Sequence, residues 1–457
     1  MADQAEVQLQ VRFVTKQEQY AVPDSPYAIQ SNVQSPELNN LLNAILKETK
    51  PLIQKVVEFD FLVCGELLCT SIAEHLQEKG ISTEDTLEIE YLERFPAPKP
   101  QECLMHDDWV SSVHTHGSWI LSGCYDNSIH IWTTKGQHKL AIPGHTSPVK
   151  GVSWVSIDGD QASFASCSHD QSAMLWVWNV ARNSVDCVVT CRGHDKGVEC
   201  IAVAVDAKHF ATGSWDNNIC LWSASLTDED NVPAKKRSKP EQGNSRTPKS
   251  TLKGHREAVS AVKWVDYNTL LSSSWDHLLK LWDCELGGIK QEIAGNKAFF
   301  DADWSPLNNS IVTASADRHV RIYDPRSTES IVKTTFTSHT GWVQSVRWST
   351  TRDTLFLSAG YDGQVKLWET RSPRTPLYDL TGHEDKVLCC DYFDFVIIVK
   401  IALKSLALVI PRTPLYDLTG HEDKVLCCDW SNPALLVSGS CDNTVRIFKA
   451  KHATASA

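Results

Sequence analysis

One pattern recurs seven times between residues 106 and 448 and restricts the possible folds more than any other feature of this chain. In each repeat an Asp lies six residues before an aromatic residue, and a Ser or Thr lies four residues before that Asp. A His stands upstream in all repeats except the fifth. The marked residues are His106, Ser122, Asp126 and Trp132; His145, Ser166, Asp170 and Trp176; His194, Thr212, Asp216 and Trp222; His255, Ser272, Asp276 and Trp282; Thr313, Asp317 and Tyr323; His339, Ser358, Asp362 and Trp368; and His421, Ser438, Asp442 and Phe448.

The segments between these marks are short runs in which apolar and polar residues alternate, for example SIHIW at 128–132 and TVRIF at 444–448. A period of two is typical of half-buried β-strands, and turn residues separate the runs. Each repeat therefore accommodates four short strands. With these marks the repeats resemble the WD40 family, whose units of about 40–45 residues form four-stranded propeller blades. The resemblance implies an all-β fold in which residues 98–450 form a seven-bladed WD40 β-propeller.

In the WD40 family the marked residues form structural tetrads, in which the Asp bonds the His, the His bonds the Ser or Thr, and the hydroxyl bonds the Trp. Such a chain satisfies polar groups that are buried where strands meet loops. A Ser, a His and an Asp could also form a hydrolytic triad. Repetition favours the structural role, because a hydrolase needs one activated nucleophile with one oxyanion hole. We expect no enzymatic activity.

The ring also needs closure, because open sheet edges are a liability that propellers manage by pairing their first and last segments. The segment 98–105 lies just before the first His and is predicted to supply the outer strand of blade seven.

Two of the spacings between successive Asp marks are long, at 60 and 80 residues, against 41 to 46 elsewhere. The 60-residue spacing contains a polar, Pro-containing segment, and residues 224–249 are predicted to be a disordered loop between blades three and four. Lys235, Lys236 and Arg237 within it form a basic cluster that suggests nuclear localisation. The alternative is an ordinary solvated charge run.

The 80-residue spacing contains a duplication, since residues 373–391 recur unchanged at 411–429. Removal of one copy and the apolar spacer, residues 373–410, restores an ordinary blade length, so we interpret this segment as inserted and non-native. The spacer is apolar enough to suggest a membrane span, but Asp394, Lys400 and Lys404 interrupt it. We expect the second copy to supply the inner strands of blade seven and the first copy to bulge outside the ring.

Residues 1–97 are predicted to form a separate α+β domain. Strands are expected at 7–13, 20–29, 57–63 and 87–91, with Pro23 and Pro26 interrupting the second. A helix is expected to be capped by Ser35, with Pro36 in its first position and Leu38, Leu41, Leu42 and Ile45 on one face. A shorter helix near 72–79 ends at Gly80. This order is that of a ubiquitin-like β-grasp.

A ubiquitin-like domain before a WD propeller resembles two related families of ribosome assembly factors, the WD-repeat protein 12 family and the notchless-type family. Local sequences such as HDDW (106–109), SHTGWV (338–343) and LYDLTGHEDKVL (377–388) are similar to the former. The seven blades also favour the former, because the notchless-type propeller has eight. The resemblance implies a scaffold in the nucleus, nucleolus and nucleoplasm that binds Pescadillo and the block-of-proliferation protein on pre-60S particles. It also implies that the ubiquitin-like domain docks the midasin ATPase by presenting one acidic residue to a metal-ion-dependent adhesion site.

Glu84 is the best match to that acidic residue, and its neighbour Asp85 is the alternative. The Mg²⁺ would be held by the partner, with an open position that a carboxylate oxygen fills. We therefore expect no cofactor and no metal bound by this chain alone. Without the resemblance, Glu84 and Asp85 are ordinary loop acids, with Ser82 and Asp85 in capping-box positions.

Charge and cysteine content limit the other possibilities. The formal net charge of −12 does not support a broad basic surface for nucleic acid, so any contact with RNA is expected to be indirect. The 15 cysteines lack CxxC or zinc-finger spacing and are expected to be reduced thiols. The N-terminus does not resemble a signal peptide.

An alternative function is a substrate receptor of a cullin-type ubiquitin ligase, because YDPR at 323–326 and WETR at 368–371 approximate a W-D-x-R motif.

Overall fold

The computed structural model describes residues 8–50, 56–68, 70–80, 86–94, 99–226, 245–327, 332–349, 352–362, 364–371, 373, 376, 378–380, 425–429, 435–440 and 444–449. The chain divides into two compact units, one comprising residues 1–96 with 371–377 and the other comprising residues 97–370 with 378–457. Within the described residues, no helix is both long and apolar enough to cross a membrane.

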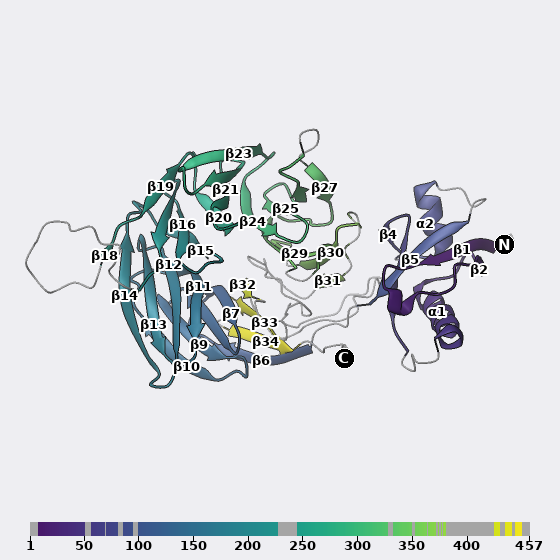
Figure 1. The fold of residues 1–457 in the computed structure, drawn as a ribbon, viewed down its shortest axis with the longest axis horizontal. Helices are drawn as coiled ribbons and strands as arrows, with labels where there is room; N and C mark the ends of the chain where they lie inside the picture. Colours follow the sequence, from purple (N-terminus) through teal and green to yellow (C-terminus); the bar gives the residue numbers. More distant parts are fainter. Residues whose placement is uncertain are drawn as a thin grey trace, which may run out of the picture. The chain divides into compact units, whose positions relative to one another are not determined.

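The N-terminal unit is built on a five-stranded sheet with the order β2-β1-β5-β3-β4 (Figure 1). Strands β1 and β5 are parallel neighbours at its centre, and the other pairs are antiparallel. This order is the β-grasp topology predicted above. The strands are β1 (Gln8–Val14), β2 (Tyr27–Gln30), β3 (Phe59–Val63), β4 (Glu66–Leu67) and β5 (Leu87–Glu93), and a 3-10 turn, η1, covers Glu18–Tyr20.

Two helices accompany this sheet, α1 (Ser35–Thr49) and α2 (Ile72–Lys79). The first begins one residue earlier than predicted, because the N-cap is Gln34, whose backbone N–H donates to Glu37 in a capping box. The hydroxyl of Ser35 is instead used to donate to the Leu68 carbonyl at 3.0 Å. The second helix has the predicted bounds and ends at Gly80, whose φ of +64° is the left-handed conformation that glycine adopts without strain.

The sheet and both helices enclose one hydrophobic core. It contains apolar residues of every long strand together with Leu38, Leu42 and Leu46 of α1 and Ile72 and Leu76 of α2. The predicted apolar face of α1 is therefore confirmed, with Leu41 and Ile45 packing partly buried at its margin.

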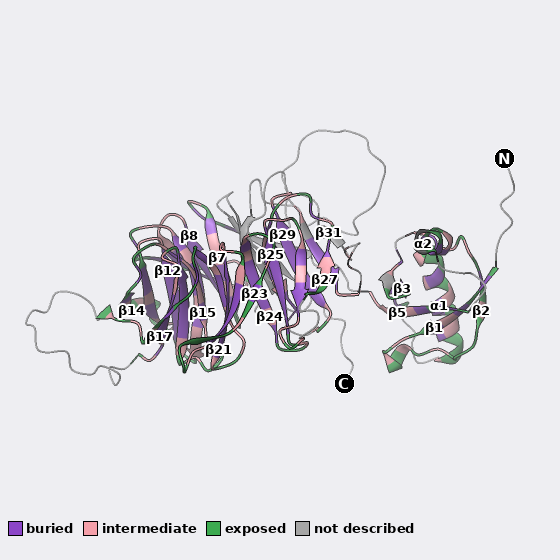
Figure 2. Ribbon diagram, turned by 90° about the horizontal axis from the view of Figure 1, so that it is seen from above, coloured by how far each residue is buried: buried purple, intermediate pink, exposed green. Residues whose placement is uncertain are grey.

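The second unit consists of seven antiparallel sheets, the blades of a β-propeller (Figures 1 and 2). Each blade places its first strand innermost. The innermost strands of blades one to six pack together in succession, and that of blade seven packs on that of blade one. In chain order, the first six blades are β7 (Val110–His116), β8 (Trp119–Cys124), β9 (Ser128–Thr133) and β10 (His138–Pro143); β11 (Val149–Asp158), β12 (Gln161–Ser168), β13 (Ser172–Asn179) and β14 (Ser184–Arg192); β15 (Val198–Val203), β16 (His209–Ser214), β17 (Asn218–Ser223) and β19 (Ser250–Lys253); β20 (Val259–Trp264), β21 (Thr269–Ser274), β22 (Leu278–Asp283) and β23 (Gly288–Ala294); β24 (Phe299–Ser305), β25 (Ser310–Ser315), β26 (Val320–Tyr323) and β27 (Val332–Phe336); and β28 (Val343–Trp348), β29 (Leu355–Gly360), β30 (Val365–Glu369) and β31 (Tyr378–Leu380).

Blade seven is closed by the N-terminal strand of the propeller. Its strands are β32 (Val425–Asp429), β33 (Leu435–Ser440) and β34 (Thr444–Lys449), and β6 (Lys99–Met105) pairs antiparallel with β34. The predicted closing strand is thus confirmed. The prediction that the second copy of the duplicated sequence enters blade seven is also confirmed, because β32 lies in that copy.

Two sequence predictions are wrong in part. The first duplicated copy does not lie wholly outside the ring, because its residues 378–380 form β31, the outer strand of blade six, and the rest of 381–410 lies outside the described residues. The predicted disordered loop also ends earlier than expected. Ser245 and Arg246 form a short strand, β18, that pairs parallel with β14, because the unpaired edge of β14 offers backbone partners there. Residues 227–244, with Lys235, Lys236 and Arg237, are not described.

Candidate functional site

The tetrads lie where the second and third strands of a blade turn into one another. In blade two, His145 Nδ1 donates to Asp170 Oδ2 at 2.8 Å, and the backbone N–H of Thr146 donates to the same oxygen at 3.1 Å. The Ser166 hydroxyl lies 2.8 Å from His145 Nε2 and accepts from Trp176 Nε1 at 2.9 Å. One chain of hydrogen bonds therefore joins the loop before the blade to its second and third strands.

Blades three, four and six repeat this arrangement. The Nδ1–Oδ2 distance is 2.8 Å in each, and the hydroxyl lies 2.7–2.8 Å from the His Nε2 and 2.8 Å from the Trp Nε1. The hydroxyl residues of blades two, three, four and six are at most 1% exposed, so a substrate cannot reach them. This burial argues for the structural role and against a hydrolytic triad. The residues concerned are His194, Thr212, Asp216 and Trp222; His255, Ser272, Asp276 and Trp282; and His339, Ser358, Asp362 and Trp368.

The same Asp also holds the turn that follows it. In blade four, Asp276 Oδ1 accepts from the N–H of Leu278 at 3.0 Å, and the intervening His277 adopts a φ of +69°. A non-glycine residue rarely adopts this conformation, and the hydrogen bond from the Leu278 N–H to the Asp276 carboxylate offsets its energetic cost. The equivalent residues Asn127, Gln171, Asn217 and Arg318 have φ values of +69° to +70°.

The hydrogen bonds also change the ionisation of the tetrads. Burial by itself would raise the pKa of Asp276, but the hydrogen bonds from His255 and Arg256 outweigh it and lower the pKa to about 2. For His194, burial disfavours the charged form, but the hydrogen bond to Asp216 outweighs it and raises the pKa to about 9.

Blade five lacks the His and uses an arginine instead. Arg321 Nη1 donates to Asp317 Oδ2 within the same hairpin, so the carboxylate keeps a cationic partner. The third residue of this repeat, Tyr323, packs edge-to-face on Phe299 at 6.3 Å between ring centroids. Blade seven cannot be compared, because His421 and Asp442 lie outside the described residues and the side chains of Ser438 and Phe448 are not described.

Blade one departs from the expected tetrad. His106 Nε2 lies 2.9 Å from the Ser122 hydroxyl, and Trp132 Nε1 donates to that hydroxyl at 3.1 Å. However, the predicted bond between His106 and Asp126 is not made: Oδ1 of Asp126 accepts from Ser128, and Oδ2 lies 3.6 Å from His130 Nε2. The difference arises because His130 competes for the carboxylate. Burial and the neighbouring His130 lower the pKa of His106 to about 3.

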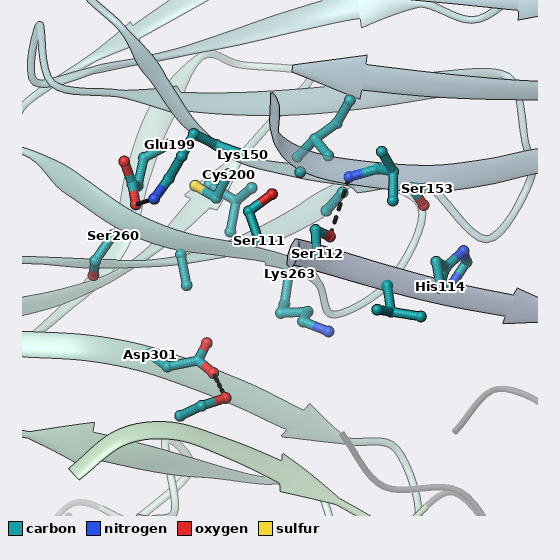
Figure 3. A pocket seen from close by; sticks show the side chains of 18 of the residues that line it. Ser111, Ser112, His114, Lys150, Ser153, Glu199, Cys200, Ser260, Lys263 and Asp301 are labelled. Carbon is teal, nitrogen blue, oxygen red and sulfur yellow. Dashed lines mark hydrogen bonds and ion pairs between the residues drawn. The ribbon is translucent and has the colours of Figure 1, made fainter. Parts of the chain in front are cut away.

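The inner strands of the propeller surround a cavity of about 400 Å³ (Figure 3). Its charged side chains are paired with one another. Lys150 Nζ lies 3.1 Å from Glu199, and Figure 3 shows this pair on neighbouring inner strands. On the other side of the cavity, Asp301 accepts from Ser345 at 2.8 Å and from Arg347. These contacts cross from one blade to the next, so they hold the ring together.

A continuous row of aromatic rings joins blades three to six. It comprises Trp215, Trp275, Phe300, Trp342 and Tyr361, and we call it the aromatic arc. Successive ring centroids lie 5.1, 6.5, 5.7 and 5.6 Å apart. Trp215 and Trp342 are 40% and 48% exposed, a high value for tryptophan in a folded domain.

The aromatic arc was not predicted from the sequence, although a signal for it exists. Trp215, Trp275 and Tyr361 each directly precede a tetrad Asp, so the turn that buries the Asp presents its neighbour to solvent. Exposed aromatic residues in such a row are typical of protein interaction surfaces. Phe300 also lines the cavity, so the aromatic arc borders the channel.

The remaining predicted site residues are less informative. Glu84 and Asp85 lie outside the described residues. In the motif at 323–326, Arg326 forms an ion pair with Asp324 at 3.1 Å, so it is engaged within its own loop. In the motif at 368–371, Trp368 and Glu369 are buried.

Comparisons with known proteins agree with this architecture. The model of the WD domain, G-beta repeat, matches residues 99–133, 136–177, 185–223, 246–283, 289–324, 330–369 and 412–449, and the model of the NLE (NUC135) domain matches residues 9–76. The ribosome biogenesis protein WDR12 homolog of Culex quinquefasciatus is 50% identical over 451 residues, which cover 98% of this chain and 96% of the relative. The homolog of the same name from Drosophila mojavensis is 51% identical over 453 residues, which cover 99% of this chain and 98% of the relative.

Proposed function

The chain belongs to the WDR12 family of ribosome biogenesis proteins, and from this premise we propose that it is a non-enzymatic scaffold in assembly of the large (60S) ribosomal subunit and in pre-rRNA processing. A scaffold needs rigid surfaces that bind several partners at once. The two compact units, each with its own hydrophobic core, meet that need.

The observation that carries the proposal is the aromatic arc beside the propeller channel. Its tryptophans supply large apolar contact areas at a low cost in side-chain entropy, as binding hot spots do. We assign this surface to the assembly partners, Pescadillo and the block-of-proliferation protein, in the nucleolus and nucleoplasm. Contact with RNA is indirect in this proposal, because the net charge of the chain is −12.

The ubiquitin-like unit is assigned the second contact, with the midasin ATPase. Glu84 would complete the coordination of a Mg²⁺ ion that the adhesion site of midasin holds, because a hard cation takes carboxylate oxygen ligands. Glu84 lies in the segment 81–85, between α2 and β5.

Mass spectrometry of a nuclear pull-down of the full-length chain tests the scaffold proposal. We expect pre-60S proteins, Pescadillo, the block-of-proliferation protein and midasin. Recovery of cullin adaptors in their place would contradict it and support a ligase receptor.

Variants separate the two contacts. Glu84→Ala should lose midasin and retain the propeller partners, while wild-type binding to midasin should disappear in EDTA. Asp85→Ala is the matched control. Loss of midasin binding in Asp85→Ala alone would show that Asp85, and not Glu84, is the ligand.

Trp342→Ala should weaken binding of the propeller partners by about 30-fold, the equivalent of a hot spot of about 2 kcal/mol. Tyr267→Ala, which removes a 71% exposed aromatic outside the aromatic arc, should have no effect.

A further inference from the structure

Blade one contains a cluster of metal-ligating side chains that no other described blade has. Cys124 ends β8, Asp126 lies in the following turn, and His130 lies in β9. The Sγ atom, a carboxylate oxygen and a ring nitrogen lie within 4.8 Å of one another. We infer that these three residues bind a divalent transition metal ion, with Zn²⁺ as the ion that their chemistry fits best.

The ligand set suits zinc in both chemistry and charge. Thiolate, imidazole and carboxylate are the three ligand types that Zn²⁺ takes in proteins. Cys124 and His130 are buried, at 0% and 8% exposure, and Asp126 is half-buried and provides the path from solvent. One thiolate and one carboxylate neutralise the dication, so the occupied site would place no net charge in a buried position.

The surrounding residues carry the features of an outer shell. His130 Nε2 faces Asp126, and His130 Nδ1 lies 3.2 Å from His138 Nε2. Metal-ligating histidines bond their second nitrogen to such a partner, which fixes the tautomer and the orientation of the ring. His138 is therefore a positioning residue.

An independent observation points to the same place. Among the described residues, the Nδ1 atom of His106 has no hydrogen-bond partner, and His106 is 6% exposed. In blades two, three, four and six this nitrogen faces the tetrad carboxylate at 2.8 Å, and in blade one its ring lies 4.7 Å from the ring of His130. A buried nitrogen without a hydrogen-bond partner needs an explanation, and in blade one this nitrogen belongs to a ring that lies beside His130 of the proposed site.

Other blades form the same turn with different residues at the positions of Cys124 and His130. Cys124 occupies the place of Ser168, Ser214 and Ser274, whose hydroxyls donate to a backbone carbonyl as the thiol of Cys124 does to Asp108. His130 occupies the place of Met174 in blade two, where the tetrad is complete. Metal binding thus explains the presence of Cys124 and His130 at positions where the blade fold does not require a cysteine or a histidine.

Metal binding proceeds with a balanced proton transfer. The Cys124 thiol loses its proton to the buffer as the sulfur–metal bond forms. The Ser128 hydroxyl, which lies 2.7 Å from His130 Nε2, releases that nitrogen to the metal and keeps its hydrogen bond to Asp126.

The test uses the full-length reduced chain, prepared metal-free and titrated with Co²⁺. We expect one Co²⁺ per chain, with the visible bands of a four-coordinate site and a thiolate-to-cobalt charge-transfer band, and displacement of both by Zn²⁺. Cys124→Ser and His130→Met should lose these bands while folding normally, because each installs the residue of another blade. His138→Gln should weaken Zn²⁺ binding by about 10–100-fold.

Controls make each outcome decisive. Cys187→Ser removes an exposed thiol and should leave the spectrum unchanged. No cobalt spectrum in the wild type, or an unchanged spectrum in Cys124→Ser, overturns the site. If a variant does not fold, the thermal unfolding of the wild type decides: Zn²⁺ should raise the midpoint and EDTA should reverse this, whereas identical midpoints contradict the inference.

Discussion

A single carboxylate in each tetrad stabilises both the blade and its turn. Asp276 accepts from His255 Nδ1, from Arg256 N–H and from Leu278 N–H, all within 3.0 Å. Asp276→Ala leaves these donors, including the buried His255, without an acceptor, so we expect a loss of about 1–3 kcal/mol in the free energy of unfolding. Urea denaturation measures this loss. Asp160→Ala, at an exposed turn, is the control and should change stability by less than about 0.5 kcal/mol.

The tetrad carboxylates also predict how stability depends on pH. Burial opposes ionisation of Asp170 and Asp276, but the hydrogen bonds of the tetrads lower the pKa of each to about 2, below the ordinary value of 3.8. A carboxyl group with a lowered folded-state pKa contributes stability above its unfolded pKa, and that contribution disappears as the pH falls through the folded pKa. We therefore expect the thermal midpoint to decrease as the pH falls from about 4 to about 2. Asp276→Asn should have a smaller dependence, and an equal dependence would contradict this explanation.

At the scale of elements, β6 closes the ring and one of its residues anchors it. Leu104 is 1% exposed, whereas the adjacent Met105 is 68% exposed on the same strand. Leu104→Ala leaves a cavity beneath the closing strand, and we expect a loss of about 2–5 kcal/mol. Met105→Ala is the matched control and should have little effect in the same denaturation experiment. Equal effects of both variants would show that β6 contributes backbone pairing alone.

The duplicated segment makes a prediction about β31 and β32. Deletion of residues 373–410 brings the identical sequence YDL at 416–418 into the place of β31, so every strand of blades six and seven retains its sequence. The connection to β32 becomes 38 residues shorter, which should stabilise the chain by about 1–2 kcal/mol through a lower cost of loop closure. Thermal unfolding of the two chains decides this, since a less stable deletion variant would show that the insert contributes native contacts.

At the scale of the whole molecule, the two compact units have separate cores. The core of the N-terminal unit contains residues 9–91 alone, whereas the propeller cores begin at Leu121. We therefore expect two calorimetric transitions for the full chain. Residues 1–97 expressed alone should reproduce one of them at the same temperature. A single transition, or an unfolded isolated unit, would show that the units depend on each other for stability.

The amino-acid sequence was enough to predict the number of blades, the closing strand and the β-grasp order of the N-terminal unit. These features follow from local rules: the period of two in strands, the chemistry of turns and caps, and the regular spacing of His, hydroxyl, Asp and Trp. The bounds of α2 and the use of the second duplicated copy in β32 also follow from neighbouring residues along the chain.

The three-dimensional structure was needed to show which side chains compete for one partner and which distant residues meet. Both His106 and His130 lie near Asp126, and the spacing of the repeat does not predict which of the two pairs with its carboxylate. The aromatic arc joins residues from four blades, whose rings come together because closure of the propeller brings successive inner strands side by side. The edge of β14 likewise recruits β18 across the chain. Such contacts depend on distances in space, and these are set by ring closure and packing rather than by position in the sequence.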